Sequence, residues 1–157
     1  MNILVACEES QRVCLEFRRL GHNAFSCDIL DESGGHPEYH IKGDVIPLLN
    51  GNVTFSTKDG SVHTIDDKWD MIIAHPPFTD LAVSGARHFE RKRENGSQQQ
   101  SIEFFCQFLY CNCDHILIEN PVGIISGDYI KEHFPELSIK YDLPKKSHTD
   151  NSTVSIW

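Results

Sequence analysis

The chain has 157 residues, a length that fits one compact domain with a hydrophobic core of its own. Apolar residues make up 39% of it and charged residues 24%, which is the composition of a globular protein rather than of a disordered or membrane-spanning one. The formal net charge of −9 opposes tight non-specific binding to duplex DNA, because an acidic surface repels phosphates. A local basic patch would be needed for such binding, and the segment 87–95 is the candidate.

The chain enters a strand-like apolar segment at once, with no basic leader before it and no cleavage signal. Its six cysteines lie mostly inside apolar runs, which is typical of reduced thiols that pack as small hydrophobic side chains. We therefore expect an intracellular protein that works in the cytoplasm of its host cell, with no membrane partner.

Short apolar runs alternate with helical patterns along the chain, which is typical of a parallel sheet covered on both faces. In the first helical pattern the apolar residues recur at helical spacing, Ser10 offers an N-cap and Gly21 a stop signal. In chain order, the predicted elements are a strand at 2–7, a helix at 10–22, a strand at 23–29, a short extended stretch around Ile41, a helical turn at 45–51, a strand at 69–74, a helix at 97–111, a strand at 115–119, and one or two edge strands at 137–144 and 152–157.

Two segments interrupt this alternation. Residues 52–65 alternate on both sides of Asp59-Gly60, which predicts a β-hairpin. Residues 88–98 are charged and contain glycine, which favours a mobile segment. We predict a single α/β domain over 1–157: a Rossmann-like, doubly wound, mostly parallel sheet with a small β-hairpin insertion.

Acidic residues follow the first three predicted strands: Glu8 or Glu9, then Asp28, then Asp44. Ligands of doubly wound sheets bind outside the carboxyl ends of the strands, where carboxylates suit ribose hydroxyls and an adenine amino group. Acids near helix starts also serve as caps and as partners of the helix dipole, and this alternative stays open.

The residues that carry a family resemblance form the stretches LVACEESQRV, GHNAFSCDI, GGHPEYHIKGDV, WDMIIAHPPFTDLAVSGARHF, IEFF and ILIENPVGIIS. Over roughly residues 1–126, with a weaker echo in NSTVSIW, the chain resembles small proteins of phages and prophages described as DNA cytosine methyltransferase-like. The resemblance implies a Rossmann-like fold that binds S-adenosylmethionine. It assigns the cofactor to Cys7, Glu8, Asp28, Gly43 and Asp44, although CEESQRV lacks the glycine that a methyltransferase usually has there.

The resemblance also implies a base-modifying site. HPPF stands where the family has Pro-Pro-Cys, and ENP stands where cytosine methyltransferases carry Glu-Asn. Methylation of carbon 5 of cytosine needs a thiolate nucleophile and a glutamate at ring nitrogen 3, around a base flipped into the site. Glu119 and Asn120 match the second element, but Phe78 replaces the nucleophile, so we expect a chain that is degenerate as a cytosine-5 enzyme.

The HPPF stretch also fits a second chemistry. Enzymes that methylate amino groups of bases use an acid or Asn, two prolines and an aromatic residue that stacks on the flipped base. Here Phe78 would be that aromatic, Pro76 and Pro77 would contact the base, and a neutral His75 would accept an amino hydrogen bond. Whether Phe78 is a lost nucleophile or a stacking platform stays open.

Other candidates have plain structural alternatives. Ser84 and Arg87 could bind a phosphate, or Arg87 could pair with a nearby acid. His36, Tyr39 and His40 form either a loop that contacts the ligand or a polar surface loop. The group of Cys111, Cys113 and His115 lacks the usual zinc spacing, so we favour packing and expect no metal site.

Two functions follow. The first is an S-adenosylmethionine-dependent methyltransferase-like phage protein that acts on a DNA base or nucleotide. The second is a non-catalytic, phage-encoded binding or interference protein that keeps the fold and a nucleotide pocket. A homodimer through the edge segment 152–157, or a host protein partner, is compatible with either.

Overall fold

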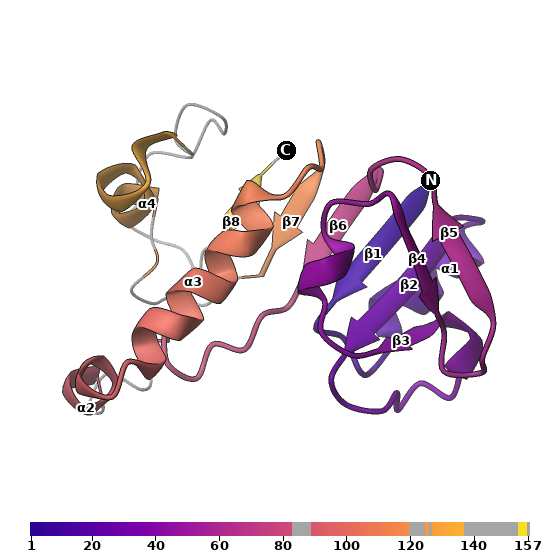
Figure 1. The fold of residues 1–157 in the computed structure, drawn as a ribbon, viewed down its shortest axis with the longest axis horizontal. Helices are drawn as coiled ribbons and strands as arrows, with labels where there is room; N and C mark the ends of the chain where they lie inside the picture. The colour runs from indigo at the N-terminus through magenta and orange to yellow at the C-terminus, as the bar shows by residue number, and fades with distance from the viewer. Residues whose placement is uncertain (83–88, 120–124, 126, 137–153, 157) are drawn as a thin grey trace.

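We describe the protein from a computed structural model, which covers residues 1–82, 89–119, 125, 127–136 and 154–156. Its centre is a six-stranded sheet in the order β3-β2-β1-β6-β7-β8, and a separate two-stranded sheet is formed by β4 and β5 (Figure 1). Every pairing in the large sheet is parallel except that of β7 with β8. The protein is thus an α/β fold with a mostly parallel sheet, consistent with a Rossmann-like core.

Most of the helices and strands lie close to where the sequence patterns predict them, but α2 and α4 were not predicted. In chain order they are β1 (Asn2–Ala6), α1 (Arg12–Arg19), β2 (Asn23–Asp28), the 3-10 turn η1 (Pro37–Tyr39), β3 (His40–Lys42), the 3-10 turn η2 (Ile46–Leu48), β4 (Val53–Ser56), β5 (Val62–Ile65), β6 (Met71–Ala74), α2 (Phe89–Glu94), α3 (Ser97–Tyr110), β7 (Ile116–Ile118), α4 (Gly127–His133) and β8 (Val154–Ile156).

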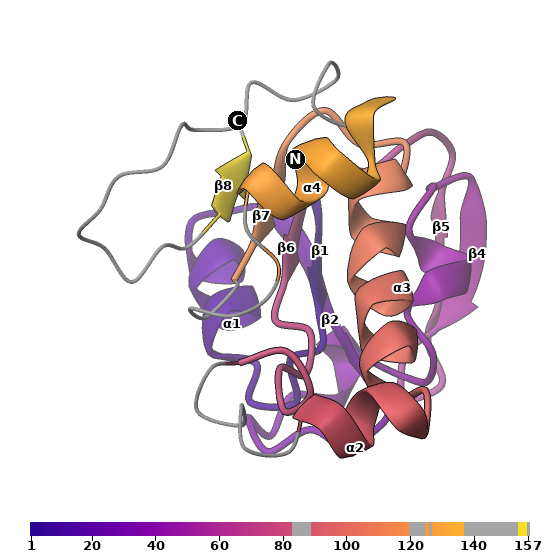
Figure 2. The same cartoon turned by 90° about the vertical axis from the view of Figure 1, so that its left-hand side faces the viewer.

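The central strands are continuous apolar runs because both faces of the sheet are covered. On one face, Cys14 of α1 packs with Ile3, Val5, Ala24 and Ile73. On the other, the neighbouring strand residues, such as Leu4 and Ile72, join the main core with α3 and the hairpin. Seen along the sheet, α1 and α3 lie on opposite sides of it (Figure 2).

The hairpin predicted at 52–65 is confirmed: β4 and β5 pair antiparallel. It packs on the α3 face through a group of rings in which Phe55 contacts both Phe25 and Trp69. Trp69 is fully buried, and its indole N–H donates to the carbonyl of Leu48 at 2.7 Å. The insertion is therefore part of the core on this face.

A group of ion pairs ties the hairpin turn to the loop between β2 and β3. Lys58 lies 2.9 Å from both Asp31 and Glu32, and Lys42 lies 2.9 Å from Asp31. The backbone N–H of Lys58 also donates to the carbonyl of His40. These links hold the loop that follows Asp28.

The sequence favours mobility for the segment 88–98, of which the structure describes residues 89–98. Most of these described residues are helical, in α2 and at the start of α3. The predicted edge strand at 137–144 lies outside the described residues, whereas β8 forms in the tail and is the outermost strand beside β7. Among the residues that the structure describes, no helix is long and apolar enough to cross a membrane.

The base of the hairpin supplies a stability test. Gly51 has φ +65°, and a Cβ there would lie 2.1 Å from the carbonyl oxygen of Asp67, which also accepts the amide of Asn52. Gly60 has φ +90° but no atom within 4 Å of a Cβ. We expect Gly51→Ala to lower the free energy of unfolding by about 3 kcal/mol or more, and Gly60→Ala by about 1 kcal/mol, the cost of the left-handed backbone alone. Urea denaturation measures both, and equal losses would contradict the close approach at Gly51.

Candidate functional site

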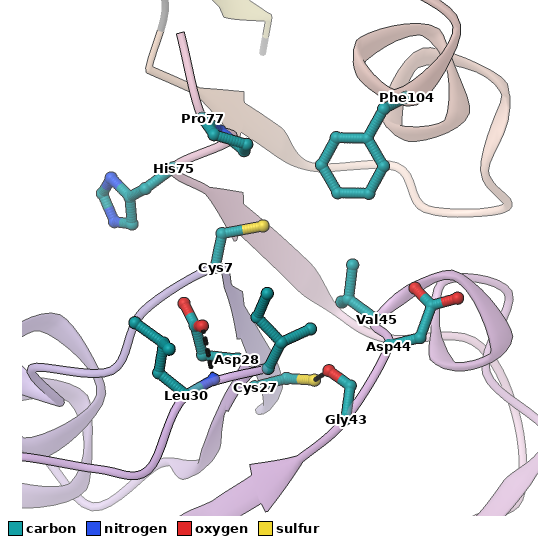
Figure 3. Close-up of a pocket in the computed structure, with 11 residues that line it drawn as sticks. Cys7, Cys27, Asp28, Leu30, Gly43, Asp44, Val45, His75, Pro77 and Phe104 are labelled. Atoms are coloured by element: carbon teal, nitrogen blue, oxygen red, sulfur yellow. Dashed lines mark hydrogen bonds between the residues drawn. The ribbon is translucent and has the colours of Figure 1, made fainter. Parts of the chain in front are cut away.

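A cavity of about 470 Å³ opens at the carboxyl ends of the parallel strands (Figure 3). Four strand ends contribute to it, and α3 closes one side with Phe104. The residues that line it are Cys7, Cys27, Asp28, Ile29, Leu30, Gly43, Asp44, Val45, His75, Pro77 and Phe104. Four of the predicted cofactor positions, Cys7, Asp28, Gly43 and Asp44, therefore share one cavity with His75 and Pro77, which were predicted to contact the base.

The strand order explains why a cavity forms here. From β1 the chain continues to β2 and β3 on one side, and it later returns to β6 on the other side of β1. The connections that leave β1 and β6 therefore run in different directions, which opens a crevice at their carboxyl ends.

Two carboxylates, from Asp28 at the end of β2 and Asp44 just after β3, lie on the cavity wall. Oδ1 of Asp28 accepts the amide of Leu30 at 2.9 Å, and Oδ1 of Asp44 accepts the amide of Ile46 at 3.0 Å. These bonds orient both carboxylates. Within the described part of the chain, Oδ2 of each has no hydrogen bond and can accept one from a ligand.

The rest of the cavity wall is mainly apolar, and most of its residues were not predicted from the sequence as part of a site. Ile29 and Leu30 follow Asp28 directly and are 74% and 58% exposed, which is unusual for consecutive large apolar residues. Val45 and Phe104 complete the apolar surface. The signal that could have revealed the first two is an apolar pair that continues past the strand-ending acid.

Cys7 lies at the end of β1 with φ 58°, and Gln11 has the same φ. The sequence lacks glycine in this loop, yet the backbone takes the left-handed conformation that glycine favours, at a cost of about 1 kcal/mol or more for each residue. The close turn after β1 is therefore present without its usual residue.

The thiol of Cys7 faces the cavity, but it is a poor nucleophile. Burial raises its pKa to about 12, and the nearby carboxylates of Asp28 and Asp44 raise it as well. Burial likewise raises the pKa of Cys27 to about 12. Neither cavity thiol can replace the nucleophile that Phe78 lacks, since a thiolate is needed for attack.

Glu8 has a different place from the one that the resemblance implies. It is 5% exposed and does not line the cavity; its carboxylate accepts the amides of Val13 at 2.6 Å and Cys14 at 3.2 Å. Burial raises the pKa of Glu8, which the two amides and the nearby His75 oppose. Glu8, and not Ser10, thus supplies the acceptor for the first turn of α1.

His75 and Glu119 form a pair at the ends of β6 and β7. Nδ1 of His75 donates to Oε2 of Glu119 at 2.8 Å, and Nε2 of His75 is buried without a hydrogen-bond partner among the described residues. Glu119 is half-exposed and is not among the lining residues, whereas His75 is.

Phe78 is half-buried and does not line the cavity, and Pro76 is buried. The carbonyl of Phe78 accepts the amides of Leu81 and Ala82, which makes a tight turn after the prolines. Asn120, Ser84 and Arg87 lie outside the described residues.

The turn after Phe78 is held by the basic segment. Lys92 is 8% exposed; its amine donates to the carbonyl of Thr79 and pairs with Asp80 at 3.1 Å. Asp80 also accepts bonds from Ser101 and, through its carbonyl, from Gln98. Lys92 thus serves the internal structure of the protein and not a DNA-binding patch.

His40 is fully buried and joins a network beneath the β2–β3 loop. Its Nε2 donates to the carbonyl of Leu30 at 3.0 Å, and Nδ1 accepts the hydroxyl of Ser26 at 2.9 Å. Gln11 bonds to Ser26 and to both backbone groups of His36. His40 therefore helps to hold the loop between β2 and β3, which contributes Leu30 to the cavity wall.

The possible zinc ligands Cys111 and Cys113 are buried in the main core, and their thiols donate to backbone carbonyls. Among the described residues, no group of three or more His, Cys, Asp or Glu side chains could hold a metal ion.

Comparisons with protein families, with curated proteins and with solved structures gave no match to this chain.

The thiol chemistry of the cavity can be tested directly. With a pKa of about 12, Cys7 holds far less thiolate at pH 7.5 than a free cysteine does, so we expect iodoacetamide to alkylate it about 1,000-fold more slowly in the folded protein. Mass spectrometry of the Cys7 peptide, with the urea-unfolded chain as the control, measures the ratio. Equal rates in the two states would restore Cys7 as a candidate nucleophile.

Proposed function

We propose that the cavity binds the adenosyl part of S-adenosylmethionine, and that the protein is a methyltransferase-like protein acting on a DNA base or nucleotide in the cytoplasm of its host cell. The observation that carries the proposal is the meeting of the Asp28 and Asp44 carboxylates with a mainly apolar wall in one cavity. A nucleoside needs both: acceptors for its hydroxyl and amino groups, and an apolar surface for its base.

The size and position of the cavity support this assignment. Its volume of about 470 Å³ lies within the range of about 300–1,000 Å³ that is usual for small-molecule sites. Its position, outside the carboxyl ends of β1, β2, β3 and β6, is where a doubly wound sheet binds nucleotides. We accordingly propose the doubly wound, Rossmann-like version of this α/β fold.

The two carboxylates have separate roles in the proposal. Asp28 follows β2 and precedes the exposed pair Ile29 and Leu30, so a ribose held by Asp28 would bring the base next to an apolar surface. Asp44 lies across the cavity mouth, after β3, and would accept the adenine amino group or a second hydroxyl. The resemblance of the sequence to phage cytosine methyltransferase-like proteins supports the same positions.

The second candidate is a non-catalytic, phage-encoded binding or interference protein that retains the nucleoside cavity. Two observations favour it: Phe78 stands in place of the nucleophile, and burial keeps the cavity thiols protonated. It differs from the first candidate in turnover and not in ligand.

Binding of the cofactor product can be tested directly. We expect S-adenosylhomocysteine to bind the full chain with micromolar affinity in a calorimetric titration. Asp28→Asn should weaken binding about 10- to 100-fold, because a hydrogen bond to a charged acceptor is lost.

Asp66→Asn is the matched control, because Asp66 is exposed and does not line the cavity. Absence of binding to the unmodified chain would remove both candidate functions as stated. Equal losses in the two variants would mean that net charge, and not the site, decides affinity.

The charge of the cavity lining can be tested as well. Among the described residues that line the cavity there are two carboxylates and no Lys or Arg, so a phosphate would meet repulsion without a compensating cation from this part of the chain. We expect adenosine to compete with S-adenosylhomocysteine at least about tenfold better than adenosine monophosphate does.

Asp44→Asn should narrow that difference by removing one of the two charges. Competition titrations at pH 7.5 and moderate salt measure the nucleoside and its monophosphate side by side. A preference for the monophosphate would assign the cavity to nucleotides instead.

A further inference from the structure

We propose that His75 accepts a proton from the group that is methylated, and that Glu119 acts through His75 as a positioning residue. This inference rests on the proposed function. It narrows the acceptor to an amino or hydroxyl group, because methylation of carbon 5 of cytosine needs a thiolate nucleophile, which neither Phe78 nor the protonated thiol of Cys7 supplies.

The sheet fixes the backbone positions of His75 and Glu119. The amide of His75 donates to the carbonyl of Ala6 at 3.0 Å, and the amide of Glu119 donates to the carbonyl of Ala74 at 2.9 Å. Both bonds continue the ladders of β6 with its neighbours, so the two residues leave adjacent parallel strands at the same edge. Their side chains are thus brought together by backbone that has little freedom.

The hydrogen bond between them sets the tautomer. A carboxylate can only accept, so the 2.8 Å contact with Glu119 places the imidazole hydrogen on Nδ1. In the neutral ring Nε2 then carries the lone pair. This nitrogen is buried and has no partner within the described part of the chain. Because His75 is among the residues that line the cavity, we take Nε2 as the acceptor for a proton from a group bound there.

The other groups around His75 cannot take this role. Cys7, which lines the same cavity, keeps its proton because its pKa is raised to about 12. Glu8 lies close enough to His75 for the two charges to interact, but its oxygens already accept the amides of Val13 and Cys14. Glu8 and Glu119, from the ends of β1 and β7, would both stabilise the imidazolium that proton transfer creates.

In the proposed transfer, the lone pair of the acceptor nitrogen or oxygen would attack the methyl carbon of the sulfonium donor, and the carbon–sulfur bond would break to leave a neutral thioether. The proton of the acceptor passes to Nε2 of His75, and the imidazolium is held against Glu119. Solvent removes the proton after the products leave.

The test measures transfer of tritiated methyl groups from S-adenosylmethionine to a random-sequence single-stranded 24-mer and to the four deoxynucleosides. We expect His75→Ala to lower kcat about 100-fold or more, as for loss of a general base. Glu119→Gln should lower kcat by a smaller factor with an unchanged KM for the donor, and Glu119→Asp should recover part of the loss.

Glu38→Gln is the matched control, because Glu38 forms the same kind of pair with His36 at 3.0 Å but does not line the cavity. Full activity of His75→Ala, or the absence of transfer to every acceptor, would overturn the proposal. Binding of S-adenosylhomocysteine is measured in parallel. If it is retained, a negative result contradicts the role of His75 as the base; if it is absent, the proposed function fails.

A second measurement does not depend on turnover. Nitrogen-15 spectra of the ring of His75 in the full chain, at a pH where it is neutral, should show the hydrogen on Nδ1, and Glu119→Gln should mix the two tautomers. A neutral ring with its hydrogen on Nε2 in the unmodified protein would contradict the assignment.

Discussion

The site depends on the parallel pairing of β1 with β2 on one side and with β6 on the other. In a parallel sheet all carboxyl ends meet at one edge, so residues far apart in the chain become neighbours without long loops. The register Ala6 opposite Cys27, and Ala6 opposite Ala74, sets the depth at which each following residue emerges. A shift of β1 by one residue would move Cys7 away from the cavity and exchange the two faces of the strand.

Two glutamates at this edge of the sheet have different roles. Glu8 is turned into the protein and satisfies the first amides of α1, so the helix is anchored to the strand that precedes it. Glu119 remains half-exposed and is directed at His75. Both acids interact with the same imidazole, which therefore lies between a structural carboxylate and an accessible one.

Much of the fold could be predicted from sequence, because each central strand is a short apolar run and the two longer helices, α1 and α3, have their own periodicity. The short helices α2 and α4 were not predicted. The hairpin was equally readable, since Asp59-Gly60 permits the turn and its flanks alternate. The acids Asp28 and Asp44 could be placed in a common cavity because strand ends share an edge. The direction of a side chain could not be read in this way: nothing in CEESQRV tells whether Glu8 faces a ligand or the amides of α1. Phe104 was not predicted either, because it reaches the cavity from a helix and follows Asp44 by about 60 residues, so only tertiary packing brings it there.

The tether between Lys92 and the turn at Thr79 and Asp80 has a consequence for redesign. The loop after Pro76-Pro77 does not take its shape from its own residues alone; the buried amine of Lys92 and the side chains of Gln98 and Ser101 hold it from α2 and α3. A thiol introduced at Phe78 would inherit this anchorage, and position 78 lies outside the cavity lining. Restoring a cytosine-5 nucleophile would therefore require new contacts between this loop and α2–α3 as well as the cysteine itself.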